Sequence, residues 1–179
     1  MRWPWHEIPG DDGFRWSLNM ARMMCGILAL LPLLFWLGAF VVMLMHGRAH
    51  EEPLIVAVLA VLALTILPAA PYVREHTAQV GIGGHLKGLL AYKLRRSVYA
   101  SFATASITAF LIAQAPALFG FIATLLTRSY VSLVVGSAIT YVAWALLWPS
   151  SSLWSRWAWE AELHRDALGV PPVATGGSV

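Results

Sequence analysis

Four stretches of the chain lack Asp, Glu, Lys and Arg, and each is long enough to cross a membrane as a helix. These stretches span residues 23–47, 53–73, 97–127 and 129–155. A hydrocarbon core about 30 Å thick is crossed by roughly 20 apolar residues in a helix. None of the stretches alternates between apolar and polar residues as a transmembrane strand does. The predicted transmembrane helices lie near residues 24–45, 54–73, 98–126 and 131–149.

The composition favours a membrane protein over a soluble one. The 179 residues are 59% hydrophobic and 12% charged, whereas about a quarter of the residues in a soluble domain are charged. The mean hydropathy is +0.68. We therefore expect an all-α polytopic membrane protein with four transmembrane helices, in which residues 23–149 form one transmembrane domain.

The segments outside the predicted helices differ from one another in composition. The chain opens with Trp, Pro and acidic residues, which is not the pattern of a cleavable signal peptide. We divide these segments into a Trp-rich N-terminal segment, a basic loop, an interfacial segment and a disordered tail. They cover residues 1–22, 74–97, 150–170 and 171–179.

The basic loop contains two further signals. Gly81, Gly83 and Gly84 predict a turn. Residues 85–96 then mix cationic and apolar side chains at helical spacing, which predicts a short interfacial helix leading into the third transmembrane helix.

Lys and Arg are concentrated on one side of the predicted membrane domain. Three precede the first helix, five lie in the basic loop and two follow the fourth helix, whereas Arg48 and Arg128 fall on the other side. Because short cytoplasmic segments retain Lys and Arg, we predict that both termini are cytoplasmic. We expect a bacterial inner membrane, since nothing in the chain resembles an organellar transit peptide.

Seven of the nine tryptophans fall on the predicted cytoplasmic side. Indole rings prefer the membrane interface because they are apolar with one polar edge. We predict that they form an anchoring belt, and the alternative is a binding surface for a protein partner or a pigment. The seven are Trp3, Trp5, Trp16, Trp148, Trp154, Trp157 and Trp159.

Small side chains recur at every fourth residue of the third predicted helix. They are Ser101, Ala105, Ala109, Ala113 and Ala117. Helices in lipid associate through close contact between small residues and through polar bonds. Four residues turn a helix by about 400°, so this row drifts around the axis and favours a right-handed crossing. Gly136 lies in a shorter row on the fourth helix, which predicts a tight hairpin of helices three and four joined at Arg128.

The absence of charge from all four stretches argues against a proton relay or a polar transport path. The most polar deep residue is Gln114. It lies beside Pro116, which removes a backbone donor and bends the helix. We expect the Gln114 amide to satisfy carbonyl groups freed by the proline, or to bond to a neighbouring helix.

The stretch from Gln114 to Leu126, QAPALFGFIATLL, resembles the ion-carrying helix of rotary ATP synthase proteolipids (c-subunits). In those proteins a Glu is followed by small residues, an aromatic residue, Gly and an apolar run. Two departures matter: Gln114 cannot titrate, and the second predicted helix lacks the Gly-rich pattern of the partner helix. The resemblance therefore implies a proteolipid-like hairpin without proton translocation.

A candidate metal site lies at the end of the first predicted helix. His46 and His50 are four residues apart and precede two glutamates. If the helix continues through Gly47, the two imidazoles lie on one face and could bind Zn²⁺ or Cu²⁺. The alternative is that these residues cap a short polar loop.

Catalytic constellations are absent from the sequence. The serines within the spans have no His or Asp at the same depth, and Cys25 has no nearby base. No histidine lies in the middle of a span, so paired axial ligands for a haem are not evident. We expect no enzymatic activity and no cofactor. The basic residues lie beside the membrane, where phospholipid rather than nucleic acid is the expected partner.

Two functional hypotheses follow. The first is a non-catalytic accessory or structural subunit of a larger inner-membrane complex, of respiratory or photosynthetic type, so that its partners are other membrane subunits. The second is a small channel or transporter that oligomerises with itself around the third helix. The lack of intramembrane charge favours the first, because a conduction path normally has polar lining from more than one helix.

Overall fold

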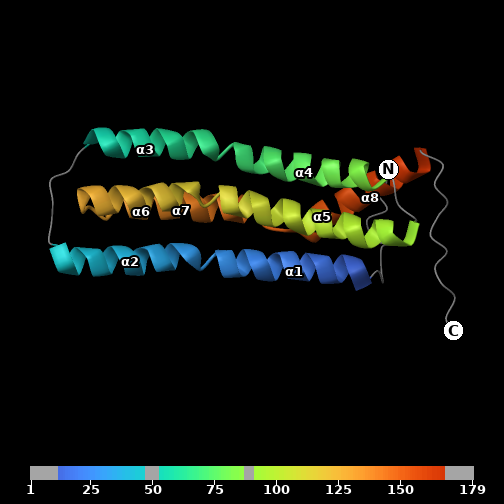
Figure 1. Cartoon of the computed structure of the whole chain (residues 1–179), viewed down its shortest axis with the longest axis horizontal. Coiled ribbons are helices and arrows are strands. Elements are labelled where there is room, and N and C mark those ends of the chain that lie inside the picture. The colour runs from blue at the N-terminus through green and yellow to red at the C-terminus, as the bar shows by residue number, and fades with distance from the viewer. Residues whose placement is uncertain (1–11, 47–52, 87–90, 168–179) are drawn as a thin grey trace.

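The computed structural model describes residues 12–46, 53–86 and 91–167, and Figure 1 draws the remaining segments as a thin trace. The described residues form helices joined by short breaks and turns. The eight helices are α1 (Asp12–Leu28), α2 (Leu31–His46), α3 (Pro53–Ile66), α4 (Ala69–Leu86), α5 (Ala91–Ile112), α6 (Ala115–Thr127), α7 (Val131–Leu147) and α8 (Ser151–Ala167).

Successive helices pair into long apolar rods. Three rods, 13–45, 53–83 and 98–127, are long and apolar enough to cross a membrane, and the bent pair α7–α8 makes a fourth if it is counted as one span. The all-α class is therefore confirmed, with three to four long apolar helices consistent with a polytopic membrane protein. A rod of 30 residues is about 45 Å long, so each of the three exceeds a hydrocarbon core of roughly 30 Å.

Each rod is interrupted close to a proline. Pro32 is the second residue of α2 and Pro116 the second residue of α6, while Pro68 and Pro149 lie in the breaks themselves. Proline has no backbone N–H and clashes with the preceding turn, so the helix cannot run through unbroken. The first three breaks lie at a similar level across the bundle (Figure 1). The fourth, between α7 and α8, bends the chain by 50°.

The third rod occupies the centre of the bundle. In Figure 1 the α5–α6 rod lies between the α1–α2 and α3–α4 rods. α5 packs mainly on α1 and α4, and α6 packs on α2, α3 and α7. Half of the apolar window of this rod is buried, against 11% for each of the other two. The first two rods therefore lie against the third rather than against each other.

The basic loop is much shorter than the sequence predicts. α4 continues to Leu86 and α5 begins at Ala91, so only residues 87–90 separate the two helices, and they lie outside the described part. The predicted turn at Gly81 and Gly83 is therefore wrong, because both glycines are helical. A Cβ on Gly81 would overlap the Ser101 side chain, so this glycine permits α4 and α5 to approach closely.

Two other boundaries also differ from prediction. Residues 12–22 of the predicted N-terminal segment belong to α1, and most of residues 150–170 forms α8. The predicted interfacial helix over 85–96 is divided, because its last residues, 91–96, form the first turns of α5.

One end of the bundle has an aromatic core, and we call it the charged end because Glu75, Arg156 and Glu160 lie beside that core. It is formed by α1, the second half of α4, the first half of α5, and α8. Phe102 lies at its centre, with ring centroids 5.9 Å from Trp154 and 5.1 Å from Trp157. All three side chains are fully buried. Aromatic packing thus attaches α8 to the central rod.

The opposite half, which we call the apolar half, consists of α2, α3, α6 and α7. Gly120 and Gly136 bring α6 and α7 together, since a Cβ on Gly120 would overlap the Ser132 carbonyl and one on Gly136 the Pro116 carbonyl. Arg128, at φ 53° and ψ 34°, ends α6 in the left-handed conformation and donates its N–H to the Thr124 carbonyl at 2.8 Å. α6 and α7 thus form a closely packed hairpin that turns at Arg128, as predicted.

The small-residue row contacts more helices than predicted. Ala105, Ala109, Ala113 and Ala117 are fully buried, whereas Ser101 is half-buried opposite Gly81 of α4. Ala105 belongs to the aromatic core of the charged end, whereas Ala109 and Ala113 lie in a second cluster with residues of α1, α4 and α7. The row therefore allows the central rod to contact several helices.

Replacing Gly136 tests the close crossing of α6 and α7. Gly136→Ala should lower the thermal unfolding temperature in detergent, because the new methyl group must displace the Pro116 backbone; overpacking of this kind costs about 1–3 kcal/mol. Gly26→Ala is the matched control, since nothing lies within 4 Å of a Cβ added there. Alanine favours a helix over glycine, so the control should be unchanged or more stable. Equal stability of the two variants would contradict the close crossing.

Candidate functional site

Polar side chains meet the helix breaks inside the apolar interior. Pro32 cannot donate to the Leu28 carbonyl, four residues before it. The Gln114 side chain, at the α5–α6 break, donates instead from Nε2 to the Leu28 oxygen at 2.9 Å. Gln114 is buried. Its amide thus satisfies a carbonyl freed by the proline of another rod, which combines the two roles expected from the sequence.

A second carbonyl is freed at the α5–α6 break. The Gln114 N–H turns back to the Leu111 oxygen at 3.2 Å, so the Phe110 carbonyl loses its usual partner in the helix. Trp144 of α7 donates its indole N–H to this Phe110 oxygen at 3.2 Å. The Trp144 and Phe110 rings also stack, with centroids 5.5 Å apart and planes at 5°. α7 therefore completes the hydrogen bonding of α5.

The start of α6 is completed by α7 in the same way. The backbone N–H of Ala117 donates to Thr140 Oγ1 at 3.0 Å, and both residues are fully buried. The first turns of a helix have N–H groups without a partner inside the helix, and a hydroxyl oxygen is one acceptor that satisfies them. Each of these three bonds joins an interrupted rod to another span.

The α7–α8 break, which we call the elbow, is held by arginines. Arg74 of α4 donates from Nη1 to the Leu147 carbonyl at 3.2 Å, and Arg22 of α1 donates from Nε to the Pro149 carbonyl at 3.1 Å. The Nε of Arg74 is buried and has no hydrogen-bond partner. The elbow is thus a site where positive charge from two rods converges.

Glu75 connects α4 to α8 beside the elbow. Its carboxylate accepts from Arg156 Nη2 at 2.8 Å and from Trp157 Nε1 at 3.3 Å. Trp154, one turn earlier on α8, donates its indole N–H to Ser17 Oγ at 3.1 Å. These bonds fix the direction of α8 after the elbow.

The predicted tryptophan belt divides into three groups. Trp154 and Trp157 are fully buried, which differs from the expected headgroup-facing position because α8 folds back onto α1, α4 and α5. Trp3 and Trp5 lie outside the described residues. The exposed group, for which the anchoring role stays a prediction, consists of Trp16, Trp148 and Trp159.

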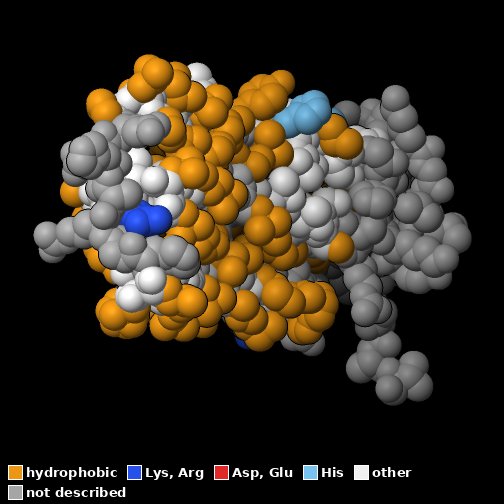
Figure 2. All heavy atoms as spheres, turned by 60° about the vertical axis from the view of Figure 1, so that its left-hand side comes forward, with side chains coloured by type: hydrophobic (Ala, Val, Ile, Leu, Met, Phe, Trp, Pro, Cys, Tyr) orange, Lys and Arg blue, Asp and Glu red, His pale blue; other side chains and the backbone are white. Residues whose placement is uncertain are grey.

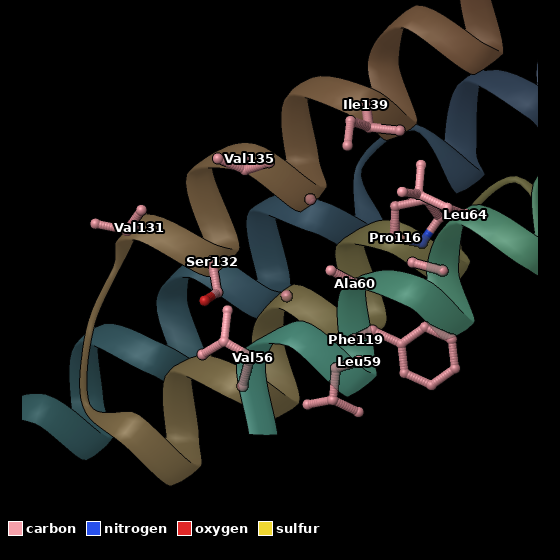
Figure 3. A pocket seen from close by; sticks show the side chains of 14 residues that line it. Val56, Leu59, Ala60, Leu64, Pro116, Phe119, Val131, Ser132, Val135 and Ile139 are labelled. Atoms are coloured by element: carbon pink, nitrogen blue, oxygen red, sulfur yellow. The ribbon is translucent and has the colours of Figure 1, made fainter. Parts of the chain in front are cut away.

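An apolar groove lies between α3 and the α6–α7 hairpin (Figure 3). Its volume is about 240 Å³. Ala60, Gly120 and Gly136 contribute little or no side chain to its lining, while Leu59 and Phe119 contribute bulkier groups. The groove has the chemistry to take an apolar segment, and no titratable side chain is among its lining residues.

A second, larger groove of about 700 Å³ lies at the elbow. Arg74 and Arg156 line it together with a run of serines at the start of α8. Leu146 and Trp148, at the end of α7, line its apolar side. Polar and apolar groups therefore meet in this groove, unlike in the first.

The predicted metal site cannot be placed. His50 lies outside the described residues, and of His46 only the backbone, at the end of α2, is described. Among the residues that the structure describes, no group of three or more His, Cys, Asp or Glu side chains is arranged to hold a metal ion.

Comparison of the chain with family models, with curated proteins and with solved structures gives no match. The resemblance of the stretch beginning at Gln114 to proteolipid helices therefore stays a prediction.

Several residues that bind across the breaks were missed by the sequence analysis. The sequence pattern places Thr140 only in the short row of small residues that contains Gly136, and it does not single out Trp144 or Glu75. One usable signal was present: a proline within a span leaves the carbonyl four residues earlier without a donor, as Pro32 does to Leu28. That rule identifies the acceptor, but the donor comes from another span.

A double-mutant cycle tests the bond from Gln114 to Leu28. Gln114→Leu should destabilise the protein by about 1–2 kcal/mol, since it leaves the partly buried Leu28 carbonyl without a donor. Pro32→Ala restores a backbone N–H that can reach the Leu28 carbonyl. In the Pro32→Ala background, Gln114→Leu should therefore cost less.

The free energy of unfolding in mixed micelles of detergent and SDS measures each corner of this cycle. Additive effects of the two substitutions would show that Gln114 does not serve the carbonyl that Pro32 frees. Thr65→Val is a control, because the Thr65 hydroxyl bonds only to carbonyls of its own helix, at Val61 and Leu62.

Proposed function

We propose that this protein is a non-catalytic accessory or structural subunit of a larger membrane complex, of respiratory or photosynthetic type. The observation that carries the proposal is that polar side chains within the apolar spans bond to the protein's own backbone. Gln114, Trp144 and Thr140 bond to backbone groups of neighbouring rods. In transporters, by contrast, unwound backbone coordinates the transported species. Here the same positions are occupied by the protein's own side chains.

The surface of the apolar half supports an assembly role. α2 and α3 each pack on α6 through one face and leave large apolar side chains exposed on the others. Figure 2 shows hydrophobic side chains covering most of the described surface that faces the viewer. Lipid satisfies such a surface, and so does a partner subunit.

The alternative is a small homo-oligomeric channel or transporter, proteolipid-like but without a titratable carboxylate. It requires that the α5–α6 rod be available to line a shared path. This rod is the most buried of the three, with helices packed on several sides. The alternative therefore has less support than the accessory role.

Native mass spectrometry after mild solubilisation of the source membrane tests the proposed role. We expect the protein in a complex with larger subunits at fixed stoichiometry. A photoreactive amino acid at Leu37 on α2 or Val61 on α3, both exposed, should cross-link to the same subunits, and one at buried Phe110 should not. A ring of identical chains would instead support the channel, and a monomer without cross-links would contradict the accessory role.

We also propose that the charged end faces the cytoplasm of a bacterial cell, because Lys and Arg are retained there. Ser152→Cys lies at this end and Ser129→Cys in the turn at the opposite end. Each is introduced with Cys25→Ala, which removes the one native thiol. A membrane-impermeant maleimide should label Ser129→Cys in intact spheroplasts and Ser152→Cys only after lysis. The reverse pattern would invert the topology.

A further inference from the structure

The groove at the elbow combines features that the apolar groove lacks. Two arginines from different helices, Arg74 of α4 and Arg156 of α8, line it. Ser150, Ser151 and Ser152 add hydroxyl groups where α8 begins. Arginine and serine are residues that bind phosphate oxygens, the first by charge-assisted hydrogen bonds and the second as a neutral donor.

The charge balance at the elbow is positive. Arg22, Arg74 and Arg156 converge there, and Glu75 is the carboxylate that lies between α4 and α8. Glu160 approaches Arg156 less closely, at 4.0 Å, and is partly exposed to solvent. Arg156 thus faces both carboxylates, Glu75 also attracts Arg74, and Arg22 and Arg74 donate to carbonyl groups. Three arginines against two carboxylates leave one net positive charge around the elbow, which favours an anion there.

Arg74 also has a donor that its own protein does not use. Its Nη1 bonds to the Leu147 carbonyl, while its Nε is buried and unpartnered. A buried donor without an acceptor is costly, and a bound ligand is one way in which such a group becomes satisfied. Because Nε is closed off from solvent, an oxygen of an occupant reaches it only when the Arg74 side chain, which lines the groove, rotates.

The apolar side of the groove indicates which anion fits. Leu146 is 79% exposed and Trp148 43% exposed, and both lie at the end of α7, next to the charged groups. Val142, one turn before Leu146, is also exposed. A free inorganic anion gains nothing from this surface, whereas a lipid places its phosphate among the arginines and its acyl chains along α7.

We propose that the elbow groove is a binding site for one anionic phospholipid. The phosphate lies between Arg74 and Arg156 at the start of α8, and the acyl chains follow the exposed face of α7. The bound lipid would hold α4, α7 and α8 together. The proposal does not depend on the accessory role, since it concerns lipid and not a protein partner.

Lipid titration followed by native mass spectrometry tests the site. The purified protein in detergent is titrated with phosphatidylglycerol and, separately, with phosphatidylcholine. We expect tighter binding of phosphatidylglycerol. The Arg74→Gln, Arg156→Gln double variant should weaken its binding about tenfold or more, because charge-assisted contacts are lost. Ser152→Glu should do the same by placing a negative charge in the groove.

Two controls separate this site from general attraction to a basic surface. Arg15→Gln removes an exposed arginine of the charged end that does not line the groove, so it should leave binding unchanged. Ser152→Glu is compatible with folding, because Ser152 is exposed in the first turn of α8, where a carboxylate favours the helix. It therefore decides the question even if the arginine variant does not fold.

Three results would overturn the proposal. The first is equal affinity for phosphatidylglycerol and phosphatidylcholine. The second is an equal loss of binding in Arg15→Gln and Ser152→Glu. The third is that inorganic phosphate raises the unfolding temperature as much as phosphatidylglycerol does, which would assign the groove to a free anion.

Discussion

The fold depends on one requirement: a backbone carbonyl exposed by a broken helix must find a donor where no water is present. Pro32 leaves the Leu28 carbonyl without a donor, and the break before α6 does the same to the Phe110 carbonyl. The donors are side chains of other rods, Gln114 for Leu28 and Trp144 for Phe110, and Arg74 bonds to the Leu147 carbonyl where α7 ends. A carbonyl left without a donor in one helix thus accepts a hydrogen bond from another helix. Because the hydrophobic effect does not hold helices together in lipid, these bonds and close packing provide the cohesion.

The closest backbone contacts and the largest buried rings lie at different ends of the bundle. In the apolar half, backbone approaches backbone at Gly120 and Gly136. In the charged end, large aromatic rings fill the space around Phe102, and a carboxylate, Glu75, fixes α8. The central rod passes through both regions, and its small side chains permit contact with several neighbours at once. The elbow lies between the two regions, where α7 ends and Arg74 and Arg22 bond to the Leu147 and Pro149 carbonyl groups.

The sequence predicted those features that depend on local composition. The long apolar helices, the buried row of small residues and the polar role of Gln114 all follow from residues near one another in the chain. Features that depend on distant partners were missed. Gly81 has the sequence signature of a turn, and only the presence of Ser101 opposite explains why it is helical. Trp157 has the composition of an interfacial anchor, and only the direction of α8 explains its burial.

The central position of the α5–α6 rod has a consequence for biosynthesis. α2 and α3 are made before α6, and each packs on α6. When the first two spans enter the membrane, the surface that they will cover does not yet exist, and the Leu28 carbonyl has no Gln114 to bond with. Until the third span is inserted, the first two spans are therefore surrounded by lipid or bound by an insertion factor. Stalling or truncation before that span would leave an incomplete intermediate exposed to membrane proteases.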